Sequence, residues 1–452
     1  MTRMIPPRAV GLTLLALVAI GCSTFRASNQ PLARWDPEQG YRPSVLAEQH
    51  PIDDVLLMLA FSGGGTRAAA LSYGVLQQLR DTPVASGRLL DEVDAITSVS
   101  GGSFTSAYYA LHGDGIFADF EQRMLRNDLQ GGLIRSLLNP INWFRMIGAF
   151  FSRSELAIGL YDRNVFDGAT FEDLIAAKGP LVQINATDLE AGSHFTFFQP
   201  QFDFLCSDLS SFSVARAVTA SSAVPAAFAP IVLRNYAGSC GFEKPAWLES
   251  ALADRKSNPR RFRAATILSE YLDASARPYI HLLDGGIADN IGLRIPLQNV
   301  LLAGGLRARE EKLDGHFRHV AVIVVNAEVH PKPEFGLAAS APGLRDILGS
   351  VSSTQIYSYN FDTIELMRES LAQWAKTLPP APDGSRVDAS LIVVDFEKLA
   401  DPAERDFFNA VPTTLSLPDA TVDRLIAVGR KLLRESAEYQ SLVERLKPQD
   451  RH

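Results

Sequence analysis

Ser100 stands where the sequence predicts a sharp turn from a strand into a helix. It follows the apolar run 93–99 and is followed at once by Gly101 and Gly102. A serine between small residues at such a turn is the pattern of a nucleophile elbow, which exposes the hydroxyl at the helix N-terminus. Free amides and the helix dipole favour developing negative charge there. Ser98 replaces the first glycine of the usual Gly-x-Ser-x-Gly pattern, so an ordinary Ser/Gly loop is the alternative.

A glycine-rich loop follows an earlier apolar run, residues 56–61. Gly63, Gly64 and Gly65 lack side chains and permit positive φ, so their amides can face a ligand oxygen. We expect these glycines, together with Gly101, to form the oxyanion hole of an acyl-transfer enzyme. The alternative is a dinucleotide fingerprint, Gly-x-Gly-x-x-Ala, but the acidic residue expected about 20 positions later is missing. A Walker A loop is excluded because no Gly-Lys-Ser/Thr follows.

Asp284, Gly285 and Gly286 come directly after the apolar run 279–283. An aspartate that ends a strand lies at the carboxyl edge of the sheet, where open α/β proteins place ligands. Its ionised carboxylate can accept a serine proton within hydrogen-bond distance. An Asp-Gly hairpin turn is the alternative. His281 would point to the opposite face of the strand from Asp284, and we assign it no catalytic role.

The three segments together, in this order and spacing, resemble the patatin-like phospholipases. Softer matches are 185–189, the Ala/Ser/Pro-rich stretch 217–230, and Asn290 after the Asp-Gly-Gly turn. The resemblance covers about residues 55–300, with Gly102, Gly285 and Gly286 among the residues that support the motifs.

This resemblance implies a serine hydrolase that cleaves acyl esters of phospholipids or other lipids and needs no cofactor. Ser100 would be the nucleophile and Asp284 its base, in a dyad without a catalytic histidine, and the reaction would pass through an acyl-enzyme. Arg67 matches the basic residue of the glycine loop, where it would steady the loop or meet a phosphate; a solvated arginine is the alternative. Alternative functions are a lipid acyltransferase and a membrane-tethered binding protein that keeps the fold without turnover.

The elements that must position these residues alternate between apolar β-rich runs and helical stretches from Val55 onward. This order predicts an α/β fold in three layers, with a mostly parallel central sheet flanked by helices, as in the patatin-like family. We expect one domain over 51–450, with its motif core at 55–300 and a C-terminal α/β extension at 301–450. The expected strands are 56–61, 93–99, 181–186, 279–283, 320–325 and 391–394, and the expected helices include 66–79, 103–111, 343–377 and 419–446.

The segment 113–166 differs because its large aromatic residues occur at helical spacing with few strand signals. One interpretation is a helical cap over an apolar active site, or a face that meets lipid. The other is helices packed on the sheet, with the aromatic residues in the core. The aromatic residues are Phe117, Phe120, Trp143, Phe144, Phe150 and Phe151.

The N-terminus has a charged start, a short apolar run at 9–21 and then Cys22. This resembles a bacterial lipoprotein signal, so we expect removal of residues 1–21 and lipid attachment to Cys22. Residues 22–50 would then be a tether. The protein would be anchored to the outer membrane of a bacterial cell envelope, facing the periplasm or the surface. A plain signal peptide of a periplasmic or secreted protein, or an uncleaved anchor, is the alternative.

The remaining cysteines bear on a possible disulfide, and the net charge bears on which binding partners are expected. Cys206 and Cys240 form an even pair that would be either a disulfide or two buried thiols. The formal net charge is −8 and no basic run stands out, so we expect no nucleic-acid partner. No His/Cys/Glu spacing indicates a metal site. The sequence does not determine the oligomeric state.

Overall fold

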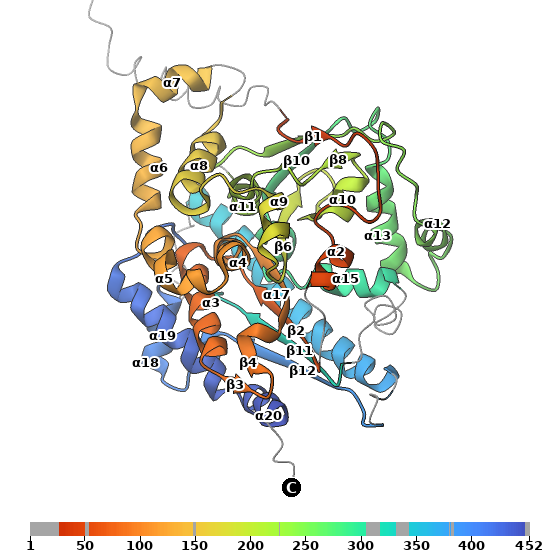
Figure 1. Ribbon diagram of the computed structural model, residues 1–452. Coiled ribbons are helices and arrows are strands. Elements are labelled where there is room, and N and C mark those ends of the chain that lie inside the picture. The colour runs from red at the N-terminus through yellow and green to blue at the C-terminus, as the bar shows by residue number, and fades with distance from the viewer. Residues whose placement is uncertain are drawn as a thin grey trace, which may run out of the picture.

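The apolar runs predicted from the sequence form the centre of one eight-stranded sheet (Figure 1). The computed structural model describes residues 27–49, 54–147, 151–225, 227–303, 317–330, 343–378, 380 and 384–447. The strand order is β12-β11-β2-β5-β6-β10-β9, and β7 pairs with β6 off this path. In that order the strands are β12 (Asp388–Val394), β11 (His319–Val325), β2 (Val55–Phe61), β5 (Val93–Val99), β6 (Leu181–Asp188), β10 (Tyr279–Asp284), β9 (Ile231–Arg234) and β7 (Ser193–Phe197).

The five strands from β12 to β6 are parallel, whereas β10 is antiparallel to both β6 and β9. The core strands β2 and β11 read as nearly continuous apolar runs because both of their faces are covered by helices. The prediction of a mostly parallel central sheet flanked by helices is confirmed.

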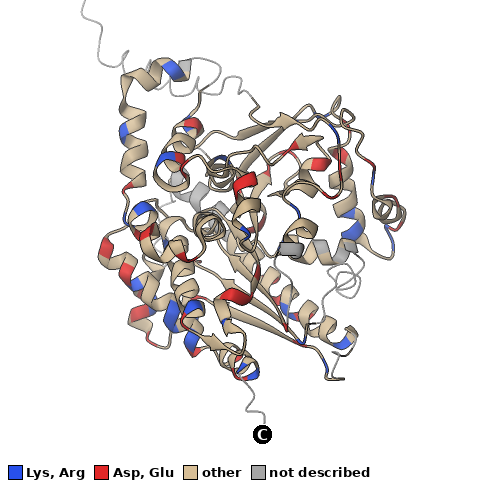
Figure 2. Cartoon of the chain, viewed as in Figure 1, with Lys and Arg blue, Asp and Glu red and all other residues tan. Residues whose placement is uncertain are grey.

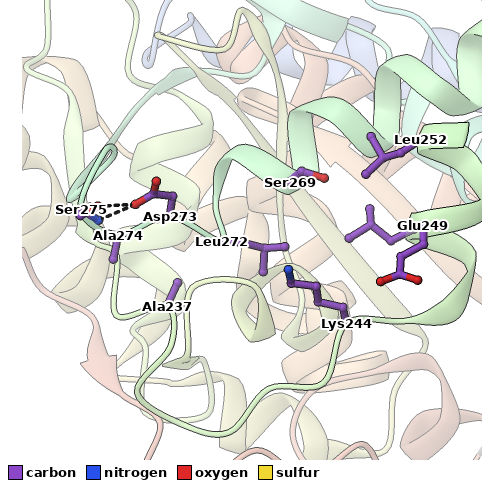
Figure 3. Close-up of a pocket in the computed structure, with 10 residues that line it drawn as sticks. Ala237, Lys244, Glu249, Leu252, Ser269, Leu272, Asp273, Ala274 and Ser275 are labelled. Atoms are coloured by element: carbon purple, nitrogen blue, oxygen red, sulfur yellow. Dashed lines mark hydrogen bonds between the residues drawn. The ribbon is translucent and has the colours of Figure 1, made fainter.

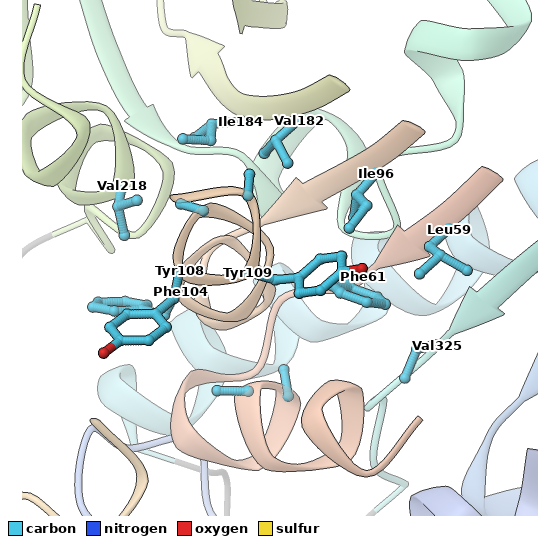
Figure 4. Close-up of a cluster of buried hydrophobic side chains, with 14 of the residues drawn as sticks. Leu59, Phe61, Ile96, Phe104, Tyr108, Tyr109, Val182, Ile184, Val218 and Val325 are labelled. Atoms are coloured by element: carbon cyan, nitrogen blue, oxygen red, sulfur yellow. The ribbon is translucent and has the colours of Figure 1, made fainter. Parts of the chain in front are cut away.

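Alternate residues along the strands divide the core between the two faces of the sheet. On one face Leu57, Leu59 and Phe61 of β2 pack with buried residues of α3 (Gly65–Arg80) and α4 (Gly101–His112). Figure 4 shows part of this cluster, with Phe104 and Tyr108 of α4 and Val182 and Ile184 of β6 among its buried side chains. The same cluster includes α11 (Val214–Ser221) and α19 (Asp419–Glu435).

On the other face Ala60 of β2 and Val322 of β11 pack with Met367 and Leu371 of α17 (Leu344–Thr377). Leu297 of α15 (Arg294–Ala303) completes this second cluster. The period of two along each strand therefore fills two separate cores, one for each layer of helices.

The C-terminal part of the chain extends the sheet at one edge, where β11 pairs with β2 and β12 pairs with β11. Its helix α19 packs closely on α3. A Cβ atom on Gly74 would lie 2.2 Å from the carbonyl oxygen of Ile426, and one on Gly429 would lie 2.5 Å from that of Leu71. Glycine at both positions allows the two helices to approach each other this closely.

The predicted tether is wrong for its described part, which is folded onto the body. β1 (Gln30–Pro31) pairs with β8 (Ser207–Asp208), and α2 (Pro43–Gln49) follows. Tyr41 is buried, and its hydroxyl accepts from the amide of Val182 at 2.7 Å. The predicted signal peptide and Cys22 lie outside the described residues.

Cys206 and Cys240 form a disulfide, with their Cα atoms 5.5 Å apart. The N-terminal segment is hydrogen-bonded to both cysteines. The amide of Leu32 donates to the carbonyl of Cys206 at 2.8 Å, and the amide of Trp35 donates to the carbonyl of Cys240 at 2.9 Å. The bond thus supports the surface on which residues 27–42 lie.

The other elements connect these layers or cover their edges. No helix in the described ranges is both long and apolar enough to cross a membrane. The α-helices are α5 (Ile116–Phe120), α6 (Leu129–Leu138), α7 (Pro140–Ile147), α8 (Arg153–Tyr161), α9 (Phe171–Ala177), α10 (Gln199–Asp203), α12 (Ala246–Ala253), α13 (Pro259–Glu270), α14 (Gly286–Asp289), α18 (Pro402–Asn409) and α20 (Ala437–Leu446). Shorter elements are β3 (Pro83–Val84), β4 (Gly87–Arg88), the 3-10 turns η1 (Leu89–Glu92), η2 (Gly113–Gly115) and η6 (Phe396–Lys398), and the π turns η3 (Glu121–Leu125) and η4 (Asp162–Phe166).

Candidate active site

Ser100 forms the turn between β5 and α4 and has a φ of 49°, a left-handed conformation that is uncommon for a residue other than glycine. The residues after it must be small. A Cβ atom on Gly101 would lie 2.1 Å from the carbonyl oxygen of Gly65, and one on Gly102 would lie 2.7 Å from that of Phe61. The predicted elbow is therefore present, and its backbone packs directly against the glycine loop.

Ser98, which departs from the usual elbow pattern, fits because its hydroxyl has a partner in the following helix. The Ser106 hydroxyl of α4 donates to Ser98 Oγ at 2.7 Å. Ser98 is fully buried, so this bond satisfies a polar group that would otherwise be costly.

The nucleophile candidate and the base candidate meet as the sequence predicts. Ser100 Oγ donates to Asp284 Oδ2 at 3.1 Å, and the amide of Gly286 donates to Asp284 Oδ1 at 2.8 Å. Both side chains are buried. Burial raises the pKa of Asp284 from 3.8 to about 6, while the hydrogen bonds from Gly286 and Ser100 lower it. The carboxylate is therefore ionised at neutral pH and is a stronger base than an exposed aspartate.

Asp284 reaches this position by a route that the sequence analysis did not foresee. We expected it at the carboxyl edge of a parallel strand, but β10 runs antiparallel to β6. In the register of the sheet, Asp284 pairs with Ala186, while the neighbouring Asn185 pairs with Val99. Asp284 therefore lies beside the elbow, because β10 runs toward the elbow and ends at Asp284.

One hydroxyl that the sequence did not single out holds the elbow in place. Ser221, the last residue of α11, accepts from the amide of Ser100 at 2.8 Å and donates to the carbonyl of Asn185 at 2.6 Å. Its own carbonyl accepts from the amide of Gly285 at 3.0 Å. Ser221 therefore connects both members of the dyad with β6. Only its place within the Ala/Ser/Pro-rich stretch could have pointed to it.

The glycine loop supplies fewer free amides than predicted. The amide of Gly63 donates to the carbonyl of Asn290 at 2.9 Å, so its expected role as an oxyanion-hole donor is wrong. The amides of Gly64, Gly65 and Gly101 have no hydrogen-bond partner within the described ranges. Gly64 and Gly65 have φ values of 144° and 61°. These three amides are the donors that remain for an oxyanion.

Asn290 lies between the glycine loop and the Asp-Gly-Gly turn. A Cβ atom on Gly63 would lie 2.4 Å from Asn290 Oδ1, and one on Gly286 would lie 2.8 Å from the same atom. The absence of side chains at these two glycines makes room for Asn290. Gly285 is restricted by a different neighbour, since its Cβ would lie 2.3 Å from the carbonyl oxygen of Asn185.

Arg67 steadies the glycine loop and is buried. Its Nε donates to the carbonyl of Ala327 at 2.9 Å, its Nη1 to that of Val411 at 2.6 Å, and its Nη2 to the hydroxyl of Thr413 at 3.0 Å. Burial lowers its pKa to about 10, so it stays charged at neutral pH. Of the two functional roles considered for Arg67, these contacts favour support of the loop over contact with a phosphate.

The segment 411–414 completes the site from the far end of the sequence. The amide of Thr66 donates to the carbonyl of Thr414 at 2.8 Å, and a Cβ atom on Gly65 would lie 2.3 Å from that oxygen. The sequence analysis missed this segment. Its only local signal is a short loop with Pro412 near its start.

Other features of the described ranges do not compete with this site. They contain no group of three or more His, Cys, Asp or Glu residues arranged to hold a metal ion. An open pocket of about 810 Å³ is lined by residues of 237–275, among them Lys244, Glu249 and Asp273 (Figure 3). None of the residues placed around Ser100 lines it.

The aromatic segment 113–166 divides between its two interpretations. Phe117 and Phe120 pack against Tyr73 of α3, with ring centroids 5.9 and 5.8 Å apart, as the core interpretation predicts. Trp143 and Phe144 of α7 are exposed instead. Phe150 lies outside the described residues.

Comparison with known proteins gives one extended family match. The family model described as patatin-like phospholipase matches residues 59–297, a span that contains the glycine loop, the elbow and Asp284. No curated protein sequence matches the chain. Human GIVD cytosolic phospholipase A2 is similar over 89% of this chain at 13% identity, with a TM-score of 0.46, and this chain covers 62% of that protein's chain. VipD from Legionella pneumophila is similar over 88% of this chain at 12% identity, with a TM-score of 0.31 and 67% of VipD covered.

Proposed function

Because this chain belongs to the patatin-like phospholipase family, we propose that it is a lipid ester hydrolase that cleaves acyl esters through a Ser100–Asp284 dyad and an acyl-enzyme. The observation that carries the proposal is the 3.1 Å hydrogen bond from Ser100 Oγ to Asp284 Oδ2. The substrates are phospholipids or other lipid acyl esters.

In the first half of the reaction, Asp284 accepts the proton of the Ser100 hydroxyl as Oγ attacks the ester carbonyl carbon. The carbonyl oxygen becomes an oxyanion, which the amides of Gly64, Gly65 and Gly101 stabilise by about 3–4 kcal/mol for each well-placed donor. The tetrahedral intermediate then collapses. The bond to the alcohol oxygen breaks, and the alcohol leaves with the proton held by Asp284.

In the second half, Asp284 accepts a proton from water as the water oxygen attacks the acyl carbon. The bond to Ser100 Oγ breaks, and the proton returns to that oxygen. The Ser221 hydroxyl, which holds the Ser100 amide, and Arg67, which holds the glycine loop, act as positioning residues.

A fluorophosphonate probe tests the nucleophile and the base together. We expect it to label the purified full chain on Ser100, as seen by mass spectrometry of the labelled peptide, and not to label Ser100→Ala. Because Asp284 must be ionised to accept the proton, and burial raises its pKa to about 6, the labelling rate should rise with pH around pH 6 and level off above it. Labelling that persists in Ser100→Ala would reject the nucleophile. A rate that does not change between pH 5 and 7 would count against Asp284 as the base.

We also propose that Cys22 carries the lipid anchor of an envelope protein, on the basis of the N-terminal sequence alone. Cells fed with a palmitate analogue should incorporate it into the wild-type protein and not into Cys22→Ser. Wild-type protein that takes up no label would contradict lipid attachment. Label retained by Cys22→Ser would place the lipid on another residue.

A further inference from the structure

The helices α6 and α7 present a stripe of large apolar side chains that no described residue covers. On α7, Phe144 is 77% exposed and Ile141 67%, and Leu138 at the end of α6 is 64% exposed. Residues 134, 137 and 138 share one face of α6 by their helical spacing, and residues 141 and 144 share one face of α7, beyond the extended Asn139. The exposed apolar residues of the stripe are Ile134, Leu137, Leu138, Ile141, Trp143 and Phe144.

The start of α6, and the helix α8 that follows α7 in the sequence, contact segments that border the dyad. At the start of α6, Gln130 Oε1 accepts from the amide of Leu415 at 3.2 Å, next to Thr414, which packs on the glycine loop. After α7, the Ser154 hydroxyl of α8 donates to the carbonyl of Ala229 at 2.6 Å. The carbonyl of Ala223, a few residues before Ala229, accepts from the amide of Asp284 at 3.0 Å. The helical pair therefore begins beside the catalytic site, and Figure 1 shows α6 running outward to α7 at the edge of the molecule.

The charge of the pair differs from that of the whole chain. Residues 129–147 contain Arg135 and Arg145 and no Asp or Glu, although the formal net charge of the chain is −8. Figure 2 shows α6 and α7 with blue segments and no red ones. Trp143, whose Nε1 donates to the carbonyl of Leu137 at 2.6 Å, adds an aromatic ring of the kind that is enriched at membrane interfaces. Arg135 forms an exposed ion pair at 3.3 Å with Asp128, the residue just before α6. An apolar surface beside arginines complements a surface of acyl chains and lipid phosphates.

The first described residues reach the same part of the fold. Asn29 exchanges two hydrogen bonds with the backbone of Arg234, at the end of β9. Ala229, which holds Ser154 after α7, lies just before the start of β9. The two contacts are about 17 Å apart along an extended chain of five residues. The first described residues thus lie near the start of α8, the helix that follows α7.

We propose that α6 and α7 dock on the surface of a phospholipid membrane, with the stripe at the boundary between head groups and acyl chains and Arg135 and Arg145 at the lipid phosphates. Docking in this way would hold the catalytic site close to the bilayer that supplies its ester. The proposal rests on the proposed function for the identity of the substrate, but membrane docking itself requires no turnover.

Trp143 provides a local probe of this docking. The full chain carrying Ser100→Ala, which prevents turnover, is mixed with phosphatidylcholine vesicles containing one quarter phosphatidylglycerol and a brominated phosphatidylcholine. We expect the bromine to quench part of the tryptophan fluorescence, and this part should be missing in Trp143→Phe. The double variant Ile141→Ser/Phe144→Ser should need about tenfold more lipid for half-maximal quenching, because two apolar side chains no longer enter the interface. Phe361→Ser is the matched control: Phe361 of α17 is 67% exposed, and its replacement should leave the quenching unchanged.

The active chain separates this proposal from the proposed function. Hydrolysis of the same vesicles should fall about tenfold in the double variant, while hydrolysis of a soluble short-chain ester stays at the wild-type rate. Quenching that does not depend on Trp143, or that the double variant leaves unchanged, would overturn the docking. A double variant that dissociates a dimer and keeps its vesicle binding would identify the stripe as a contact between two copies instead. Trp143-dependent quenching in a protein that hydrolyses no ester would reject the proposed function and leave the docking intact.

Discussion

Asp284→Asn is expected to lower ester hydrolysis by about 10⁴-fold, and Ser100→Ala by at least as much. Asparagine keeps the shape of the side chain and can still accept the hydrogen bond from Gly286, but it has no carboxylate to take the proton from Ser100 Oγ. Alanine at position 100 removes the attacking oxygen altogether. The measurement is the steady-state rate on a short-chain ester at pH 8, where the carboxylate is ionised.

Asp289 offers a matched control for the loss of Asp284. It is also buried, and burial raises its pKa to about 6, but its Oδ2 accepts from the amide of Arg294 at 2.7 Å rather than from Ser100. We expect Asp289→Asn to keep hydrolysis within a few-fold of the wild type, since an amide oxygen can still accept that bond. If Asp284→Asn retained a tenth or more of the wild-type rate, the dyad would be rejected. An equal loss in both variants would point to folding rather than chemistry.

The second large effect of Asp284→Asn is on the free energy of unfolding. The substitution that removes activity should make the folded protein more stable. Burial raises the pKa of Asp284 from 3.8 to about 6, so the folded protein binds this proton more tightly than the unfolded chain does. The stabilisation from the protonated form is fully present below pH 3.8 and is lost as the pH rises through 6. At pH 8 the buried carboxylate therefore lowers the free energy of unfolding by about 3 kcal/mol, and Asp284→Asn should recover up to that amount.

Urea unfolding at several pH values measures this effect. The difference in stability between Asp284→Asn and the wild type should be largest at pH 8 and should shrink as the pH falls through 6 toward 4. Ser100→Ala leaves the carboxylate in place and removes one of its donors, so it should give no such gain at pH 8. A variant less stable than the wild type at pH 8, or a difference independent of pH, would contradict the burial of an ionised Asp284. A gain in stability of Asp284→Asn that is largest at pH 8 would make the dyad an example of activity maintained at the expense of stability.

The sequence predicted the parts of the site that depend on local pattern. An apolar run followed by small residues gave β5 with the bounds observed, and it placed Ser100 at the turn into α4. Asp284 was also identified, although for an incomplete reason. Strand direction is not encoded in hydrophobic periodicity, because a parallel and an antiparallel strand bury the same residues. The antiparallel course of β10 therefore had to come from the structure.

Contacts between distant parts of the chain account for the other differences. The Gly63 amide is occupied because Asn290 lies beside it, and no local signal near Gly63 reports that neighbour. The composition of the proline-rich segment before Val55 predicts a tether. Its described part is instead held on the body by Tyr41, which is buried and bonds to Val182, far along the sequence. The predicted helix over 419–446 is divided at Ser436, whose hydroxyl accepts from the amide of Tyr439 at 3.3 Å and so starts α20.

The contact between Arg67 and the segment 411–414 has a consequence for biosynthesis. A nascent chain contains both Ser100 and Asp284 long before the ribosome adds Val411, Thr413 and Thr414. Until those residues fold back onto Arg67 and Gly65, the amides meant for the oxyanion lack the support that positions them. Translation itself thus delays completion of the candidate site until residues 411–414 have been made.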